Sequence, residues 1–411
     1  GDAYPCFMTE EELAEIRAEQ EATKANPGIY GKWAKGRNLS YEEIEEKVKA
    51  GTPYVIRLKS KGNPDLPPEE MKRISVIDAI RGEISMPENV MDIVILKATG
   101  IPTYHFAHII DDHLMRTTHV VRGEEWLSSL PVHVEMFELM GWEHPVYCHT
   151  AHMMKIGEEG TKRKLSKRKD PELSLDFYRQ DGYHPAAMRE YLITILNSDF
   201  EEWRIANPDA HIDEFEFAAE KMSNSGALFD LQKLSDVCKD VLVKIPAPEL
   251  YDFLLKWAET YKPEVTGVLK ADRGYVEKIL DVGRSGAKPR KDFIYASQMF
   301  DFIKYFFDDY FVIEDEIPEN VSVEDAKAIL AGYLESYDHA DDQSVWFDKI
   351  RELGTSLGYA AKPKDFKKHP EEYKGHVGHV STVIRLAVTG RSQSPDVWEI
   401  QQILGSDRTV A

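Results

Sequence analysis

The chain has 411 residues, which is too long for one ordinary hydrophobic core and indicates roughly two to four domains. With 42% hydrophobic and 30% charged residues the sequence is globular rather than disordered, and no apolar run approaches the ~18 residues of a membrane span. Its net charge of −21 excludes a broad positive surface for non-specific nucleic-acid binding, but leaves room for an RNA held at a few local basic patches.

The N-terminal region begins with two helices and two strands. The segments T-E-E-E at 9–12 and S-Y-E-E at 40–43 are capping boxes, in which a hydroxyl and a glutamate satisfy free N–H groups at a helix start. Residues 52–58 and 91–97 are rich in apolar and β-branched side chains, and both are predicted to be strands.

An α/β pattern extends over residues 90–158. An apolar run gives a predicted strand near 105–111, and H-V-V-R-G-E-E-W follows at 119–126. Ser128 is a plausible N-cap of the next helix, which Gly141 is expected to end. Short apolar strands that alternate with helices in this way are typical of an α/β domain.

Beyond Pro171 the pattern becomes helical. His184 and Pro185 start a predicted helix with one apolar stripe at a 3.6-residue period. The stripe consists of Met188, Tyr191, Leu192, Ile195 and Leu196. From there to the end the sequence shows no convincing strand pairs, so the α/β part is predicted to be N-terminal and the all-α part C-terminal.

A dense group of positive charges lies at residues 161–169, T-K-R-K-L-S-K-R-K. Charge of one sign concentrates substrate phosphate and stabilises charge that develops during group transfer, so this loop is expected to bind a polyanion. A solvated basic run or a nuclear-import-like patch is the alternative interpretation of these residues taken alone.

The surrounding sequence resembles the bacterial glutamyl-tRNA synthetases, which are class I aminoacyl-tRNA synthetases. K-L-S-K-R, Lys164 to Arg168, resembles the second signature of the class, and T-G-I-P-T-Y-H-F-A-H-I-I-D-D-H-L-M-R-T-T-H-V-V-R-G-E-E-W-L-S-S-L-P at 99–131 resembles the second half of the active-site domain. N-S-G-A-L-F-D-L-Q-K-L at 224–234 and I-R-L-A-V-T-G-R-S-Q-S-P at 384–395 continue the family order. The resemblance covers nearly the whole chain.

The resemblance implies four segments. Residues 1–98 are expected to form the acceptor-stem insertion, and 99–158 the second half of the Rossmann-like nucleotide-binding domain. Residues 159–245 would hold the K-L-S-K-R loop and a helical stem-contact region, and 246–411 an α-helical anticodon-binding domain.

The implied activity is ATP-dependent activation of glutamate to glutamyl-adenylate, followed by transfer to the 3′ end of tRNA(Glu). Lys167, and less directly Lys164, match the lysines that neutralise the phosphates of ATP, which the family uses with Mg²⁺. Ser166 lets the loop turn, and Arg168 helps to seat it.

Five further positions match substrate contacts of the family. Arg122 matches an arginine that faces the amino acid, where a guanidinium fork suits a carboxylate. Tyr104 and His108 lie at amino-acid contact positions, and His108 departs from the residues that relatives often carry. Glu125 and Trp126 lie beside the nucleotide.

No metal site is expected. Eight of the fourteen histidines lie between His105 and His152, but as strand residues His105 and His108 would point to opposite faces. Some relatives carry a zinc knuckle where this chain has residues 4–9, and here only Cys6 remains while Met8 takes another ligand position.

The first signature of the family, H-[IV]-G-H, is not found upstream of Lys164. The string H-V-G-H at 376–379 follows P-E-E-Y-K-G rather than an apolar strand, and we interpret it as a chance match. The resemblance therefore predicts that Gly1 coincides with the start of the acceptor-stem insertion, that the chain is truncated before it, and that the chain alone forms no adenylate.

Three cysteines, Cys6, Cys148 and Cys238, are odd in number and far apart, which is typical of a reducing cytoplasm. We therefore expect a cytoplasmic protein without membrane association, and the resemblance implies a monomer. Two alternatives stay open: a non-catalytic tRNA-binding fragment, and a non-discriminating enzyme that also charges tRNA(Gln). A glutaminyl-tRNA synthetase is less consistent with the strand-poor C-terminal half.

Overall fold

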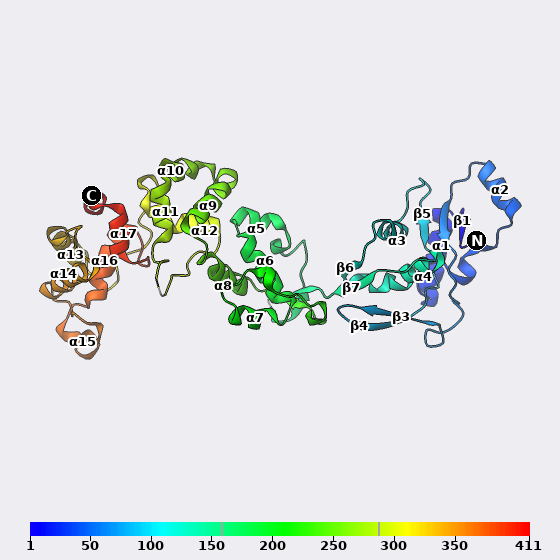
Figure 1. The fold of residues 1–411 in the computed structure, drawn as a ribbon, viewed down its shortest axis with the longest axis horizontal. Helices are drawn as coiled ribbons and strands as arrows, with labels where there is room; N and C mark the ends of the chain where they lie inside the picture. The colour runs from blue at the N-terminus through cyan, green and yellow to red at the C-terminus, as the bar shows by residue number, and fades with distance from the viewer. Residues whose placement is uncertain (158, 287) are drawn as a thin grey trace. The chain divides into compact units, whose positions relative to one another are not determined.

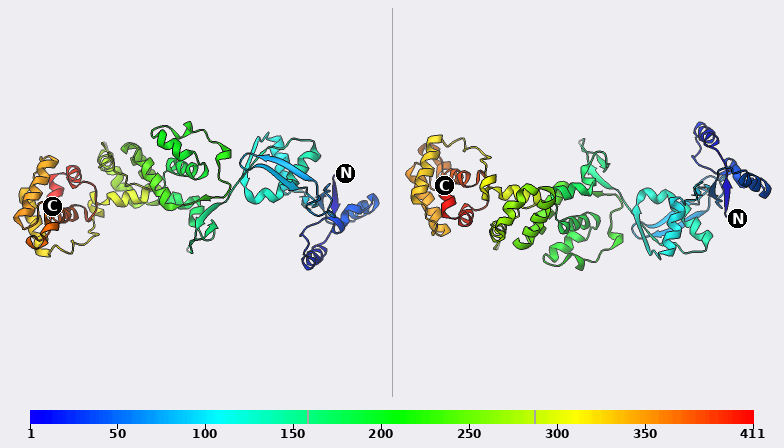
Figure 2. Two further views of the ribbon diagram at one scale, coloured as in Figure 1. Left: turned by 90° about the horizontal axis from the view of Figure 1, so that it is seen from below. Right: turned by 90° about the horizontal axis from the view of Figure 1, so that it is seen from above.

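The computed structural model describes residues 1–157, 159–286 and 288–411, and the chain divides into two compact units. The first comprises Gly1–Leu165 with Ile193–Phe229, and the second Ser166–Leu192 with Asp230–Ala411. Figure 1 labels the elements, and Figure 2 shows the same ribbon from two further sides. Strands gather in the N-terminal part and helices in the C-terminal part, which confirms the predicted combination of α/β and all-α regions. Among the described residues, no helix is both long and apolar enough to cross a bilayer.

The first sheet is antiparallel, with the strand order β1-β2-β5. β1 spans Ala3–Cys6, β2 spans Val55–Leu58 and β5 spans Val94–Leu96. The last two lie within the predicted strands at 52–58 and 91–97, so both predictions are confirmed.

Two helices of the first unit begin at the predicted capping boxes. α1 spans Glu10–Thr23 and α2 spans Tyr41–Lys49. At the start of α1 the hydroxyl of Thr9 accepts from the Glu12 backbone N–H at 3.3 Å, while the Glu12 carboxylate accepts from the Thr9 N–H at 2.9 Å. Ser40 takes part in the same reciprocal pair at the start of α2.

The second sheet has the strand order β4-β3-β7-β6. β3 spans Arg73–Asp78 and forms an antiparallel hairpin with β4, Gly82–Pro87. β6 spans His119–Gly123, and β7, Val146–Thr150, runs parallel to both β3 and β6. Parallel strands with a crossover connection are the α/β arrangement that the sequence predicts for this region.

The segment predicted as a strand near 105–111 is a helix, so that prediction is wrong. α3 spans Tyr104–Leu114 and buries Ile109 completely, in a core formed with residues of α4, Leu130–Met140. A short apolar run does not distinguish a strand from a buried helix by periodicity alone. The helix places His105 and His108 one turn apart, on the same side rather than on opposite faces.

The boundaries of α4 agree only in part with the prediction. Its C-terminus is at Gly141, whose φ of 69° is the left-handed conformation that glycine adopts without strain. Ser128 is not its N-cap, because it lies inside a preceding 3₁₀ helix, η3, Glu124–Ser129. The 3₁₀ helix η3 therefore continues directly into α4, which begins without a side-chain cap.

A small third sheet corrects the prediction of a chain without paired strands after His184, because it includes one two-residue strand from that region. β8 spans Met153–Ile156 and β9 spans Lys162–Lys164, and they form an antiparallel pair. β10, Ala227–Leu228, pairs in parallel with β8. A two-residue strand has too little periodicity to be recognised in the sequence.

The remaining described helices are mostly short, and the boundary between the units falls within α6. They are α5 Leu175–Asp181, α6 Pro185–Leu196, α7 Phe200–Ala206, α8 Leu231–Leu242, α9 Ala247–Tyr261, α10 Thr266–Ala271, α11 Arg273–Asp281, α12 Ala296–Ile303, α13 Val323–Ser336, α14 Gln343–Ser356, α15 Pro363–Lys368, α16 Val377–Thr389, α17 Val397–Leu404 and α18 Ser406–Val410. The predicted start of α6 at Pro185 is confirmed. Its predicted stripe is only partly buried: Tyr191 is fully buried, whereas Leu192 is 38% exposed.

The C-terminal helices enclose a core of their own. Side chains of α13, α14 and α16 form it, including the fully buried Ile329 and Val380. Within it the hydroxyl of Tyr333 accepts from Trp346 Nε1 at 2.8 Å and bonds to the Gln401 side chain. Burying these polar groups is inexpensive because each has a partner.

Candidate active site

The second sheet places Arg122 on its edge strand. Because β6 and β7 pair in parallel, Arg122 lies directly opposite His149 in the register. Asp78 ends the neighbouring strand β3, and its Oδ2 accepts from both the backbone N–H and the ring Nδ1 of His149, at 3.0 and 2.7 Å. The side chains of Asp78 and His149 are both almost completely buried.

The guanidinium of Arg122 is held on two sides. Its Nε donates to His149 Nε2 at 2.9 Å, and its Nη1 lies 3.1 Å from Nδ1 of His133 on α4. The guanidinium carbon also lies 4.8 Å from the centre of the Tyr147 ring, a cation–π distance. The remaining nitrogen, Nη2, is buried and has no hydrogen-bond partner in the described part of the chain. A buried donor of this kind costs free energy unless a ligand pairs with it.

Three histidines from α3 and α4 surround this arginine. His105 Nδ1 lies 2.9 Å from His133 Nε2, and His108 Nδ1 lies 2.7 Å from Asp112 Oδ2. Burial, with the charges of His108 and Arg122 beside it, lowers the pKa of His133 to about 2. Burial also lowers the pKa values of His105 and His108 below their ordinary range. The cluster is therefore a neutral polar wall beside one fixed positive charge at neutral pH.

Aromatic rings form a second wall next to it. The rings of Tyr104 and Trp126 lie 4.5 Å apart, and Tyr104 stacks against His108 at 5.9 Å with an angle of 10°. Tyr104 is half exposed, so its ring remains accessible to a ligand. This pairing brings together three of the predicted substrate contacts, Tyr104, His108 and Trp126.

Acidic side chains follow β6. Glu124 Oε2 accepts from Arg81 at 2.7 Å, whereas the Glu125 carboxylate is exposed and lies 3.6 Å from His152. Glu125 directly precedes Trp126 in η3, so its carboxylate lies on the same turn after β6 as one ring of the aromatic wall.

The K-L-S-K-R motif is divided between the two units. In the first unit, Lys164 Nζ lies 3.2 Å from His152 Nε2, and the Leu165 side chain is buried. In the second, the backbone N–H of Ser166 donates to Asp170 Oδ2 at 2.8 Å, which closes a tight turn. Lys167 and Arg168 are exposed on this turn. The structure thus places Ser166 at the turn that the sequence predicts.

Sequence reasoning missed several residues of the site. Asp78, His133 and His149 were not predicted to take part, yet all three contact Arg122 directly or through one another. The one available signal was the crowding of eight histidines between His105 and His152. The predicted strand puts His105 and His108 on opposite faces, whereas the helix α3 puts them on the same side.

Two other histidine groups do not resemble a catalytic site. His369, Glu371 and Glu372 are the one group of three close potential metal ligands found among the described residues, and all three are exposed. In H-V-G-H, His376 Nδ1 accepts from Gly378 N–H at 3.0 Å and His379 Nδ1 accepts from His376 N–H at 3.2 Å. These two rings cap the start of α16, which explains the motif without a role in phosphate binding.

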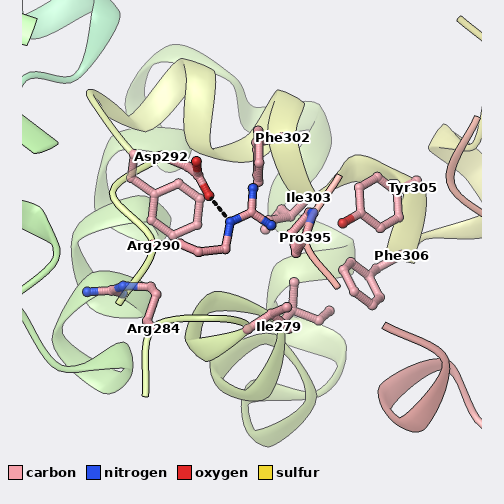
Figure 3. A pocket seen from close by; sticks show the side chains of 11 residues that line it. Ile279, Arg284, Arg290, Asp292, Phe302, Ile303, Tyr305, Phe306 and Pro395 are labelled. Atoms are coloured by element: carbon pink, nitrogen blue, oxygen red, sulfur yellow. Dashed lines mark ion pairs between the residues drawn. The ribbon is translucent and has the colours of Figure 1, made fainter. Parts of the chain in front are cut away.

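The second unit contains a pocket with two arginines (Figure 3). Arg290 pairs with Asp292 at 2.7 Å, and its guanidinium lies 5.9 Å from the Phe302 ring. Arg284 has a structural role, because its Nη2 donates to the carbonyl oxygens of Leu242, Val243 and Ile245 at the end of α8. The lining is completed by Ile279, Val282, Phe293, Ile303, Tyr305, Phe306 and Pro395.

Comparison with known proteins accounts for both units. Residues 1–236 match the family model of the catalytic domain of class I tRNA synthetases (E and Q), and residues 249–411 match an anticodon binding domain. The fold and the site together therefore define a class I tRNA synthetase.

Individual relatives narrow this assignment. The glutamate–tRNA ligase of Acetivibrio thermocellus is 62% identical over 408 residues, covering 99% of this chain and 73% of the relative. That of Clostridium perfringens strain 13 is 47% identical over 411 residues, covering 99% and 74%. A crystal structure of a glutamate tRNA ligase from Elizabethkingia meningosepticum, in complex with its amino acid, matches with a TM-score of 0.73 at 27% identity, covering 99% of this chain and 78% of that one. The chain belongs to the glutamate–tRNA ligase family, in its bacterial form.

Proposed function

We propose that this chain supplies the amino-acid site and the K-L-S-K-R phosphate site of a glutamate–tRNA ligase. The reaction joins glutamate to the α-phosphate of ATP, releases pyrophosphate, and then transfers the glutamyl group to the 3′ end of tRNA(Glu). The observation that supports this best is the Arg122 guanidinium, whose buried Nη2 has no partner in the described part of the chain while its other donors are fixed. A substrate carboxylate would satisfy that donor and neutralise the charge.

Four further residues are assigned to the glutamate and the nucleotide. Tyr104 and His108 contact the glutamate beside Arg122. Glu125 and Trp126 border the nucleotide, where the exposed carboxylate and the indole ring fit ribose and base.

The K-L-S-K-R turn acts on the phosphates of ATP, which is bound with Mg²⁺. Lys167 and Lys164 offset the charge that develops as the α-phosphorus is attacked. Both side chains are exposed, and Lys164 would exchange its contact with His152 for the phosphates. Ser166 lets the turn close, and Arg168 seats it.

Four segments divide the contacts with tRNA. Residues 1–98 bind the acceptor stem and 99–158 complete the amino-acid site, 159–245 carry the phosphate loop and contact the stem, and 246–411 bind the anticodon. The protein is proposed to act as a cytoplasmic monomer.

The 411-residue chain on its own is proposed to bind tRNA without forming adenylate. Activation in this family uses two phosphate-binding signatures, and the H-V-G-H string is occupied with capping α16. An enzyme that also charges tRNA(Gln) is the second candidate.

The amino-acid site is tested by calorimetric titration of the purified chain with glutamate, glutamine and aspartate. Glutamate should bind, and Arg122→Lys should restore only part of what Arg122→Ala loses, because an ammonium does not reproduce the fork. Arg73→Lys, on the exposed side of β3, is the matched control and should bind like the parent. Equal affinity in the Arg122→Lys variant and the parent would remove Arg122 from the site.

The proposal for the chain alone is tested by pyrophosphate exchange with glutamate, ATP and tRNA present together. No exchange is expected. Turnover near the rate of a whole ligase would mean that another group replaces the first signature. A gel-shift assay with tRNA(Glu) and tRNA(Gln) then measures which tRNA the chain holds.

A further inference from the structure

Five side chains form one continuous hydrogen-bonded series through the first unit. It runs from Asp78 on β3 to His149 on β7, then to Arg122 on β6, and on to His133 and His105 on the helices. The four distances between ring, carboxylate and guanidinium atoms are 2.7, 2.9, 3.1 and 2.9 Å. Three of the five side chains, Asp78, His133 and His149, are almost fully buried, so water does not compete for these bonds.

Arginine fixes the direction of every bond in the series. A guanidinium has five N–H donors and no acceptor, and it does not deprotonate in proteins. His149 Nε2 must therefore accept from Arg122 Nε. The ring then carries its proton on Nδ1, which donates to the Asp78 carboxylate.

The hydrogen bond on the other side of the arginine also has one possible direction. His133 Nδ1 lies 3.1 Å from Arg122 Nη1 and must accept from it. Because His133 is neutral, its proton lies on Nε2 and is donated to His105 Nδ1. His105 in turn carries its proton on Nε2. Each of the three rings thus has one defined tautomer.

We infer that Asp78, His149 and His133 are positioning residues that lock the Arg122 guanidinium in the orientation that leaves Nη2 for the substrate. This inference rests on the proposed role of Arg122 in glutamate binding. Asp78 acts at the greatest distance. Its Oδ1 accepts from the N–H groups of Ile80 and Arg81, and its Oδ2 from His149, so the carboxylate has no freedom to turn. A protonated His149 would direct an N–H at the Arg122 N–H and break the series.

The tautomers are measured directly on the 411-residue chain labelled with ¹⁵N in histidine and arginine. Long-range ¹H–¹⁵N correlation at neutral pH should show His149 with its proton on Nδ1, and His133 and His105 with theirs on Nε2. The Arg122 Nε–H resonance should exchange slowly with water. Signals are assigned by single histidine substitutions. A parent His149 with its proton on Nε2 would overturn the inference without any variant.

Two substitutions of His149 separate positioning from packing. The amide of glutamine reaches the place of Nε2, so His149→Gln keeps an acceptor for Arg122 and loses the Asp78 bond. The shorter His149→Asn keeps a donor for Asp78 and loses the acceptor. We expect His149→Asn to weaken glutamate binding about 10–100-fold, as when an orienting partner is removed, and His149→Gln to weaken it clearly less. Equal losses in the two variants would contradict a positioning role.

The Arg122 Nε–H signal distinguishes the two proposals. It should persist in His149→Gln and exchange rapidly in His149→Asn, whether or not glutamate binds. If the unsubstituted chain binds no glutamate, the proposed role of Arg122 is refuted. The positioning of Arg122 by its neighbours is then tested by the histidine tautomers and by this signal. Loss of the signal in both variants would overturn it.

Discussion

Two groups of cations in this chain are held in opposite ways. Arg122 is enclosed by buried partners that fix two sides of its guanidinium, whereas Lys167 and Arg168 stand exposed on a turn. A carboxylate is small and planar, so its recognition depends on angles, and a rigid fork supplies them. Phosphates spread charge over several oxygens that move during the reaction, and an ammonium on a flexible stem follows them.

A charged side chain that must keep one orientation needs many surrounding contacts. A side chain that only has to supply positive charge does not. The hydrogen bonds that fix Arg122 involve three strands (β3, β6 and β7), two helices and three neutral rings. The turn that carries Lys167 needs little more than the Ser166–Asp170 hydrogen bond. Substitutions in the two groups should therefore differ in size and in kind.

The largest effect is expected for Arg122→Ala. Removing the fork leaves a substrate carboxylate unpaired in a partly dry site, and we expect glutamate binding to weaken by about 2–5 kcal/mol, measured by calorimetry on the purified chain. Circular dichroism of the same sample checks that the fold is kept. A loss below about 1 kcal/mol would show that Arg122 adds only to the general field and is not a directed contact.

Acid should lower the stability of the unit that contains Arg122 and His133. Burial and neighbouring charge lower the pKa of His133 from 6.5 to about 2, so below pH 6.5 the unfolded chain binds a proton that the folded chain does not. The stability is complete above pH 6.5 and is lost as the pH falls toward 2. From pH 7 to pH 5 this residue alone should lower the free energy of unfolding by about 2 kcal/mol.

Denaturant unfolding at the two pH values measures this change. The variant His133→Gln does not titrate and should lose less stability on acidification than the parent. His119→Gln, at an exposed position on β6, is the control and should keep the parent's dependence. The same pH dependence in all three proteins would mean that His133 titrates alike in the folded and the unfolded chain.

A smaller effect is expected for tRNA binding when the exposed cations are removed. The double change Lys167→Ala with Arg168→Ala should weaken binding of the chain to tRNA about tenfold or less. It should also reduce the slope of log affinity against log salt by about one unit for each lost phosphate contact. Fluorescence titrations at several salt concentrations give both values. An unchanged slope would place these cations away from the phosphates.

The smallest expected effect is on folding. Lys167→Ala alone should change the free energy of unfolding by no more than about 0.5 kcal/mol, because the side chain is exposed and contributes no cap or core contact. Denaturant titration checks this directly. A larger loss would show that the turn depends on its lysine and would weaken the contrast with Arg122.

Local signals in the sequence were enough for the elements that depend on neighbours in the chain. The capping boxes at Thr9 and Ser40, the strands within 52–58 and 91–97, and the stop at Gly141 each involve residues only a few positions apart. The apolar run before Met115 was assigned to a strand because periodicity is ambiguous in a short buried segment. The segment is helical because it packs against α4, and the residues of α4 lie outside the apolar run from which the prediction was made.

Candidate site residues can be proposed from the sequence only where family motifs lie. Arg122, Tyr104 and Lys167 belong to segments that resemble the family, so the sequence proposes them. Asp78 and His149 are 71 positions apart and meet only because β3 and β7 pair in parallel. No periodic pattern or motif joins two residues across such a distance, and their partnership becomes visible only in the folded sheet.

The parallel register of β6 and β7 limits where insertions and deletions can occur during evolution. Successive side chains of a strand point to opposite faces, so losing or gaining one residue near the middle of β6 would turn Arg122 away from His149. The segment between β2 and β3 carries no such pairing and separates the two sheets. Length variation in relatives is therefore expected to accumulate in that segment and to be excluded from β6 and β7, where a shift of one position exchanges the inside of the site for its outside.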